Sequence, residues 1–101
     1  MLASIVKVKR LDADANATLP IGTLVHGILV VSGTLTATAS LALHDAATVT
    51  GDPKIEIGTN TADATNYEKY AGIFLPYPLK FYVSVSANIS GTGAVAYIYY
   101  S

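Results

Sequence analysis

Apolar and polar residues alternate along most of the chain, and this alternation predicts β-strands. From Thr34 to Leu43 every second residue is apolar, and most of the residues between them carry a hydroxyl group. The same period of two recurs in residues 6–9, 54–57 and 79–86. Because successive side chains of a strand point to opposite faces, each run predicts a strand with one face buried.

The run from Thr23 to Ser32 differs because it is apolar at consecutive positions. Strict alternation divides it into two sets, Leu24, Ile28 and Val30 against Val25, Leu29 and Val31. Such a pattern predicts a strand covered on both faces, either at the centre of the protein or against a partner subunit. We therefore take the second set as candidate interface residues.

Turn-forming residues separate the predicted strands. Ser32-Gly33 predicts a hairpin between the strands on either side of it, and residues 90–93 predict another between the last two strands. Residues 76–78, Pro-Tyr-Pro, predict a rigid extended kink, and residues 58–70 predict a long polar loop. About seven to eight short strands result, so residues 1–101 are predicted to form a single antiparallel β-sandwich domain, jelly-roll-like in type.

The composition is poor in charge for a domain of this size. Charged residues make up 13% of the chain and hydrophobic residues 51%, whereas ordinary soluble domains contain about 25% charged residues. This balance predicts that another protein chain covers part of the surface. The alternative is a neutral surface coated with Ala, Thr and Ser.

Charge and hydropathy disfavour nucleic-acid and membrane partners. The net charge is −1, and the only local basic cluster is Lys7, Lys9 and Arg10, which is too small to follow a phosphate backbone. The most apolar stretch, residues 21–31, is shorter than the roughly 20 residues of a spanning helix. The basic residues near the start follow the short apolar segment instead of preceding it, so export by the usual secretory route is not expected.

No pattern of catalytic, cofactor-binding or metal-binding residues is evident. The chain has no cysteine and two histidines, His26 and His44. His44 precedes Asp45, but consecutive strand residues point to opposite faces, so we expect Asp45 to cap a turn instead of orienting the imidazole. The series Asp12-x-Asp14-x-Asn16 lacks the Gly and Glu of an EF-hand loop, although another type of calcium site stays open. We predict no enzymatic activity, cofactor or metal.

Tyrosine is the most distinctive residue type, with seven copies against two Phe and no Trp. Tyrosine is enriched at protein interfaces because it combines a large apolar ring with a polar tip. Packing in a β-sheet core is the alternative, and sugar binding has less support because no loop gathers Asp, Asn and Trp. The candidate interface therefore also includes six tyrosines: Tyr67, Tyr70, Tyr77, Tyr97, Tyr99 and Tyr100.

Three segments, Leu41–Ile55, Ile73–Ser86 and Gly91–Tyr100, resemble small virion proteins of tailed bacteriophages. They carry a Leu-His-Asp strand followed by a Gly-x-Pro turn, a Pro-Leu step into a strand with Phe and Val, and a Gly-x-Gly turn before a tyrosine-rich end. The resemblance implies a capsid decoration (cement) protein, assembled in the host cytoplasm and located in the virion. Its implied partners are itself, as a homotrimer, and the major capsid protein or another virion protein.

Two functions from different classes follow. The first is a non-enzymatic decoration protein that stabilises the capsid shell through protein–protein contacts. The alternative is a receptor- or carbohydrate-binding module of a phage fibre or tail.

Overall fold

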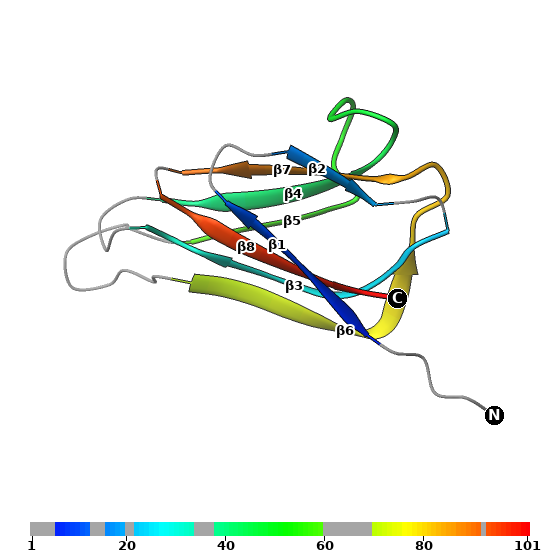
Figure 1. The fold of residues 1–101 in the computed structure, drawn as a ribbon, viewed down its shortest axis with the longest axis horizontal. Coiled ribbons are helices and arrows are strands. Elements are labelled where there is room, and N and C mark those ends of the chain that lie inside the picture. The colour runs from blue at the N-terminus through cyan, green and yellow to red at the C-terminus, as the bar shows by residue number, and fades with distance from the viewer. Residues whose placement is uncertain (1–5, 13–15, 20–21, 34–37, 60–69, 92) are drawn as a thin grey trace.

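The protein forms a β-sandwich of two sheets (Figure 1). The structure is a computed structural model that describes residues 6–12, 16–19, 22–33, 38–59, 70–91 and 93–101. Within these ranges the chain forms eight strands and no helix. The strands are β1 (Lys7–Asp12), β2 (Asn16–Leu19), β3 (Leu24–Val31), β4 (Ser40–Asp45), β5 (Ile55–Gly58), β6 (Tyr70–Lys80), β7 (Val85–Ser90) and β8 (Val95–Tyr100).

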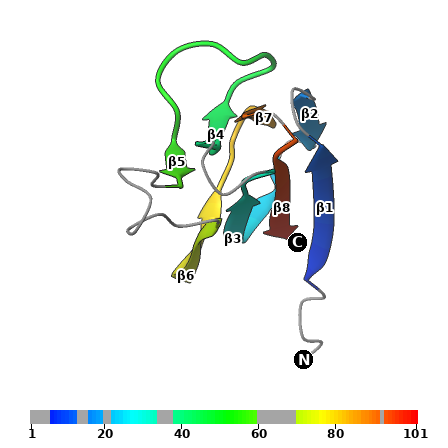
Figure 2. The same cartoon turned by 90° about the vertical axis from the view of Figure 1, so that its left-hand side faces the viewer.

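The strand order is that of a jelly roll. One sheet has the order β1-β8-β3-β6 and the other β2-β7-β4-β5, and Figure 2 shows them as two separate layers. β1 pairs with β8, β2 with β7, β3 with β6 and β4 with β5, all antiparallel. This pairing is that of a chain folded back at its middle and then rolled into two layers. The predicted antiparallel, jelly-roll-like sandwich is confirmed.

The hydrophobic core lies between the two sheets. Its largest fully buried side chains include Ile28 and Ile98 from one sheet, Leu41 and Leu43 from the other, and Phe81 from the β6–β7 connection. Burying a side chain of this size contributes about 1.5–3 kcal/mol. The period-two prediction is confirmed for Leu41 and Leu43, while residues 34–37 of the same predicted strand lie outside the described residues.

The two predicted hairpins are wrong. β3 and β4, which flank Ser32-Gly33, lie in different sheets, and so do β7 and β8. Among strands consecutive along the described chain, β4 and β5 pair directly. The turn residues were read correctly as breaks, but both breaks carry the chain from one layer to the other. A short turn signal does not specify which strand becomes the hydrogen-bonded neighbour.

The alternating run 79–86 is divided between the sheets. β6 ends at Lys80 and β7 begins at Val85, so Phe81 and Val83 belong to the connection and have opposite environments. Phe81 is fully buried, and its backbone exchanges hydrogen bonds with Thr23 and Gly22, each 3.0 Å. Val83 is 53% exposed. The predicted single strand is therefore wrong at its centre, because the chain crosses between layers there.

A β-bulge at His26 reverses the phase of β3. Val25 pairs with Tyr100 and Gly27 with the next residue of β8, Tyr99, so His26 has no partner of its own in that strand. The extra residue turns Val25 to the core side, where it packs with Ile28 and is fully buried. The prediction of Val25 as an interface residue is wrong, because strict alternation does not allow for the bulge.

Candidate interaction surface

The outer face of the β1-β8-β3-β6 sheet is apolar and aromatic. Residues paired across an antiparallel ladder project from the same face, and Leu11, Ile28 and Ile98 mark the inner face because they are buried in the core. The residues that alternate with these form the outer face. We call this surface the aromatic face, and its apolar members are Val8, Leu29, Val31, Tyr70, Phe74, Val95, Tyr97 and Tyr99.

Strand register brings these residues together from distant parts of the sequence. One row runs across all four strands through Val8, Tyr99, Gly27 and Phe74. A parallel row ends on β6 at Tyr70, after Val95 and Val31. Tyr70 is 68% exposed, Phe74 67% and Val8 53%, so both edges of the face present large apolar area to solvent.

A glycine allows the central row to pack closely. The ring of Phe74 lies against Gly27, where an added Cβ atom would stand 2.5 Å from Phe74 Cδ1. The same ring meets Tyr99 with the centroids 5.2 Å apart and the planes tilted by 47°. This tilted arrangement is favourable for aromatic pairs. The row is therefore packed within the sheet before any partner binds.

Two charged groups of the aromatic face, Arg10 and Asp12, neutralise each other at its β1 edge. Arg10 and Asp12 alternate with Leu11 on β1, and their side chains form an ion pair of 2.7 Å, Arg10 Nη1 to Asp12 Oδ1. A hydrogen bond to the Tyr97 side chain and the charge of Asp12 raise the pKa of the Arg10 guanidinium. A further positive group, Lys80, lies on the same face at the end of β6, where it pairs with Leu24.

The outer face of the other sheet has a different character. Its side chains on β4 and β7 are small or polar, among them Ser40 and Ser90, whose hydroxyl oxygens are 2.7 Å apart, and the exposed Asn88. Ser84 and Ser86 each donate a hydrogen bond of 2.6 Å to the carbonyl of Ala46. The sandwich therefore has one polar outer face and one aromatic outer face.

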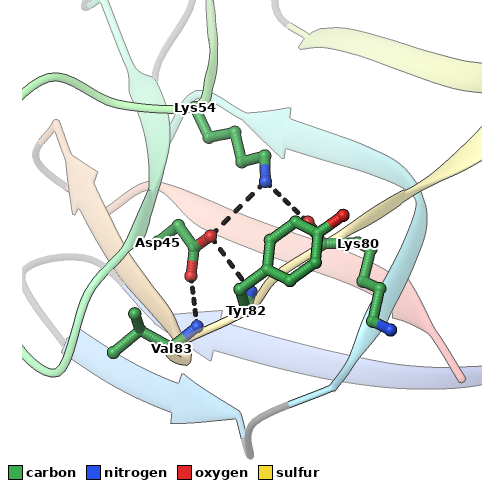
Figure 3. A network of polar contacts seen from close by, with 5 residues as sticks. All are labelled: Asp45, Lys54, Lys80, Tyr82 and Val83. Carbon is green, nitrogen blue, oxygen red and sulfur yellow. Dashed lines mark hydrogen bonds and ion pairs between the residues drawn. The ribbon is translucent and has the colours of Figure 1, made fainter.

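Asp45 is the centre of a polar network at the end of β4 (Figure 3). Its carboxylate accepts hydrogen bonds from the backbone N–H groups of Tyr82 at 3.0 Å and Val83 at 2.7 Å. Lys54 Nζ lies 3.4 Å from the same carboxylate and donates to the Lys80 carbonyl at 2.6 Å. The two backbone donors, followed by Lys54, lower the pKa of Asp45.

The Asp45 network joins the end of β4 to the backbone of the β6–β7 connection. His44 does not join it, because His44 Nδ1 contacts the Thr50 carbonyl at 3.1 Å. The expectation that Asp45 does not orient the imidazole is confirmed, although the backbone that Asp45 binds belongs to the distant β6–β7 connection and not to its own turn. His26 Nε2 is likewise occupied by the Ser101 hydroxyl at 2.7 Å.

The structure brings together five of the predicted interface residues on the aromatic face: Leu29, Val31, Tyr70, Tyr97 and Tyr99. Tyr77 is 83% exposed but belongs to a segment of β6 that leaves the ladder opposite His26. Tyr100 packs against the core, and Tyr67 lies outside the described residues. Sequence reasoning missed three members of the face, Val8, Phe74 and Val95, because only strand register places them there.

The described residues contain no group of three metal-binding side chains. Residues 13–15 of the calcium-like series lie outside the described ranges. The same described part of the chain contains no helix that could span a lipid bilayer.

The sequence matches no protein-family model, and comparison with curated proteins and with solved structures gives no match. The resemblance to virion proteins therefore stays a prediction.

Proposed function

We propose that this chain is a non-enzymatic structural protein of a bacteriophage virion, a capsid decoration protein whose aromatic face is buried against another protein chain. The aromatic face is the observation that carries the proposal. Large contiguous apolar patches on soluble proteins often mark interaction sites. The low content of charged residues, 13% of the chain, agrees with a surface that is covered in an assembly.

A decoration protein stabilises its shell by binding only to the assembled state. A ligand that binds one state and not the other shifts the equilibrium toward the bound state by mass action. A small rigid sandwich suits this role, since it loses little conformational entropy when it binds. The partners in this proposal are further copies of the chain and the major capsid protein, and the homotrimer implied by the resemblance stays a prediction.

In this proposal the histidines and Asp45 have structural roles. The two imidazoles contact Ser101 and the Thr50 carbonyl, and the Asp45 carboxylate binds two backbone donors and Lys54.

Purified virions of the phage that carries the sequence provide the test. We expect the 10.5 kDa chain to be present in many copies per particle. Shells that lack it should open at a lower temperature, and addition of the purified chain should restore their stability. Absence of the chain from intact particles, together with no binding to their shells, would refute the proposal.

A receptor- or carbohydrate-binding role is the second candidate, and the observation that favours it is the exposure of Tyr77 between Pro76 and Pro78. An aromatic ring on a rigid segment can stack on a sugar. A glycan array with the wild type and Tyr77→Ala distinguishes the two roles. Saturable binding that is lost in the variant would favour this second role over decoration.

A further inference from the structure

We propose that a second copy of this chain covers the aromatic face, so that two sandwiches pack face to face as a two-fold dimer. The inference deepens the proposed function and rests on the aromatic face being an interface. It names the occupant of that face and the symmetry of the contact, which the proposed function leaves open.

The edges of the same sheet disfavour the other common mode of self-association, in which strands join edge to edge. The β1 edge carries the exposed residues Lys7 and Lys9, and charged side chains, lysine above all, oppose strand addition. At the β6 edge, residues 75–78 leave the ladder between Phe74 and Leu79, and two of them are prolines that lack an N–H donor. The face is therefore the surface of this sheet that remains open to a partner.

The packing of the face suits contact with another flat sheet. Phe74 lies across Gly27 instead of standing away from the sheet, and Leu29 lies in the same way against Gly72, where an added Cβ would be 2.9 Å from Leu29 Cδ1. Side chains that are already held in place lose less conformational entropy when an interface forms. Two such low-relief surfaces can approach to the roughly 10 Å at which stacked sheets pack.

Charge agrees with this occupant. In the part of the aromatic face between the Val8–Phe74 row and the Val95–Tyr70 row, the charges of Arg10 and Asp12 cancel, and Lys80 lies beyond that part, beside Leu24. A strongly acidic or basic partner would find no complementary charge in this part of the face. A neutral apolar surface whose edge charges cancel would match it. A second copy of this chain presents a surface of that kind and brings no unpaired charge into the contact.

The area of the face sets the expected strength of the dimer. The sheet is four strands wide, with strands about 4.8 Å apart and residues about 3.3 Å apart along each strand. Three rows of side chains on such a sheet would bury roughly 1,000 Å² in total between two copies, which is near the lower limit for a specific interface. We therefore expect a reversible dimer with a dissociation constant on the order of micromolar.

The symmetry follows from the use of one surface by both partners. A patch that contacts its own copy is isologous and closes at two subunits, whereas a trimer needs two different surfaces on each subunit. The inference therefore differs from the homotrimer implied by the resemblance to virion proteins, and a mass measurement separates the two.

Sedimentation equilibrium and light scattering over about 1–500 µM, a range that brackets the expected dissociation constant, test the inference on the full chain. The wild type should pass from a monomer of 10.5 kDa to twice that mass. Val8→Glu and Phe74→Glu each place a charge in the proposed contact, once per copy, and should weaken dimerisation by at least about 30-fold. Asn88→Glu is the matched control, because it adds the same charge to the exposed outer face of the other sheet, and it should dimerise like the wild type.

Circular dichroism spectra and thermal melts establish that each variant is folded. If Phe74→Glu fails to fold, Val8→Glu, at an exposed edge position, retains the test. A wild-type monomer at the highest concentration, a trimer, or a dimer that Asn88→Glu weakens as much as Val8→Glu would each overturn the inference. The virion role is judged separately by the presence of the chain in particles, so the two proposals can fail independently.

Discussion

The carboxylate of Asp45 accepts a hydrogen bond of 2.7 Å from the backbone N–H of Val83, which joins the end of β4 to the β6–β7 connection. The contact fixes the segment that carries the chain from one sheet to the other. Asp45→Asn keeps the shape of the side chain but removes its charge and one of its two acceptor oxygens. We expect a lower melting temperature and faster hydrogen exchange at residues 82 and 83.

Asp52→Asn is the control for this change. Asp52 lies in the exposed turn between β4 and β5, and its loss of charge should leave the melting temperature within experimental error. Equal effects of the two substitutions would show that net charge, and not the Asp45 contacts, is responsible.

The stability should depend on pH through the same carboxylate. The backbone N–H groups of Tyr82 and Val83, followed by Lys54, hold the folded-state pKa of Asp45 below its usual value of 3.8. A carboxyl group with a depressed folded-state pKa contributes stability that is fully present above its unfolded-state pKa and is lost as the pH falls through the folded-state pKa. Urea unfolding from pH 7 down to about pH 2.5 should therefore show a steeper loss below pH 4 for the wild type than for Asp45→Asn. Parallel curves for the two proteins would contradict this.

Local pattern predicted β3, β4 and β5 and parts of β1 and β7, since the period of two depends only on neighbouring positions. It did not predict β2 or the part of β6 before Leu79. Two of the predicted interface tyrosines, Tyr97 and Tyr99, lie on the outer side of β8, and Ile98 between them is buried. Local pattern failed where one residue changed the phase, at the His26 bulge, and where the chain changed layers, at residues 81–84. Both events depend on contacts between segments that are distant in sequence.

The aromatic face was only partly predictable for the same reason. Leu29 and Tyr99 were identified from composition and alternation. The contact of Phe74 with Tyr99 depends on both strands pairing with β3 in one register, and no local pattern records that register. The exposure of Val8 was also not predicted, because an alternating Val-Lys strand predicts that the valine is buried.

The difference between Phe81 and Val83 gives a direct test of the layer crossing. Phe81 is fully buried and Val83 is exposed, although both occupy the same phase of the alternating run. Phe81→Ala should lower the free energy of unfolding by about 3–5 kcal/mol because it leaves a cavity in the core. Val83→Ala should change it by no more than about 0.5 kcal/mol, as is usual at exposed positions. Denaturant titrations of both variants measure this difference, and similar losses would mean that one continuous strand is present.

Gly91 lies close to the backbone of residues 38 and 39, and its substitution by alanine should cost more stability than that of Gly51. Both have positive φ angles, 118° and 71°, which L side chains adopt at a cost of about 1–2 kcal/mol. A Cβ at Gly91 would also lie 2.6 Å from the Thr38 carbonyl oxygen and 2.9 Å from Ala39 Cα, whereas at Gly51 nothing lies within 4 Å. The atoms that Gly91 approaches are backbone, so they cannot move away as a flexible side chain would.

Gly91→Ala should therefore destabilise the protein by about 2–4 kcal/mol, as backbone strain and steric overlap add, and Gly51→Ala by about 1–2 kcal/mol from backbone strain alone. Chemical denaturation of the two variants against the wild type measures both values. If Gly91→Ala costs no more than Gly51→Ala, the β7–β8 connection does not approach residues 38 and 39 as closely as described. A larger loss at Gly91 would instead support the close approach of Gly91 to residues 38 and 39.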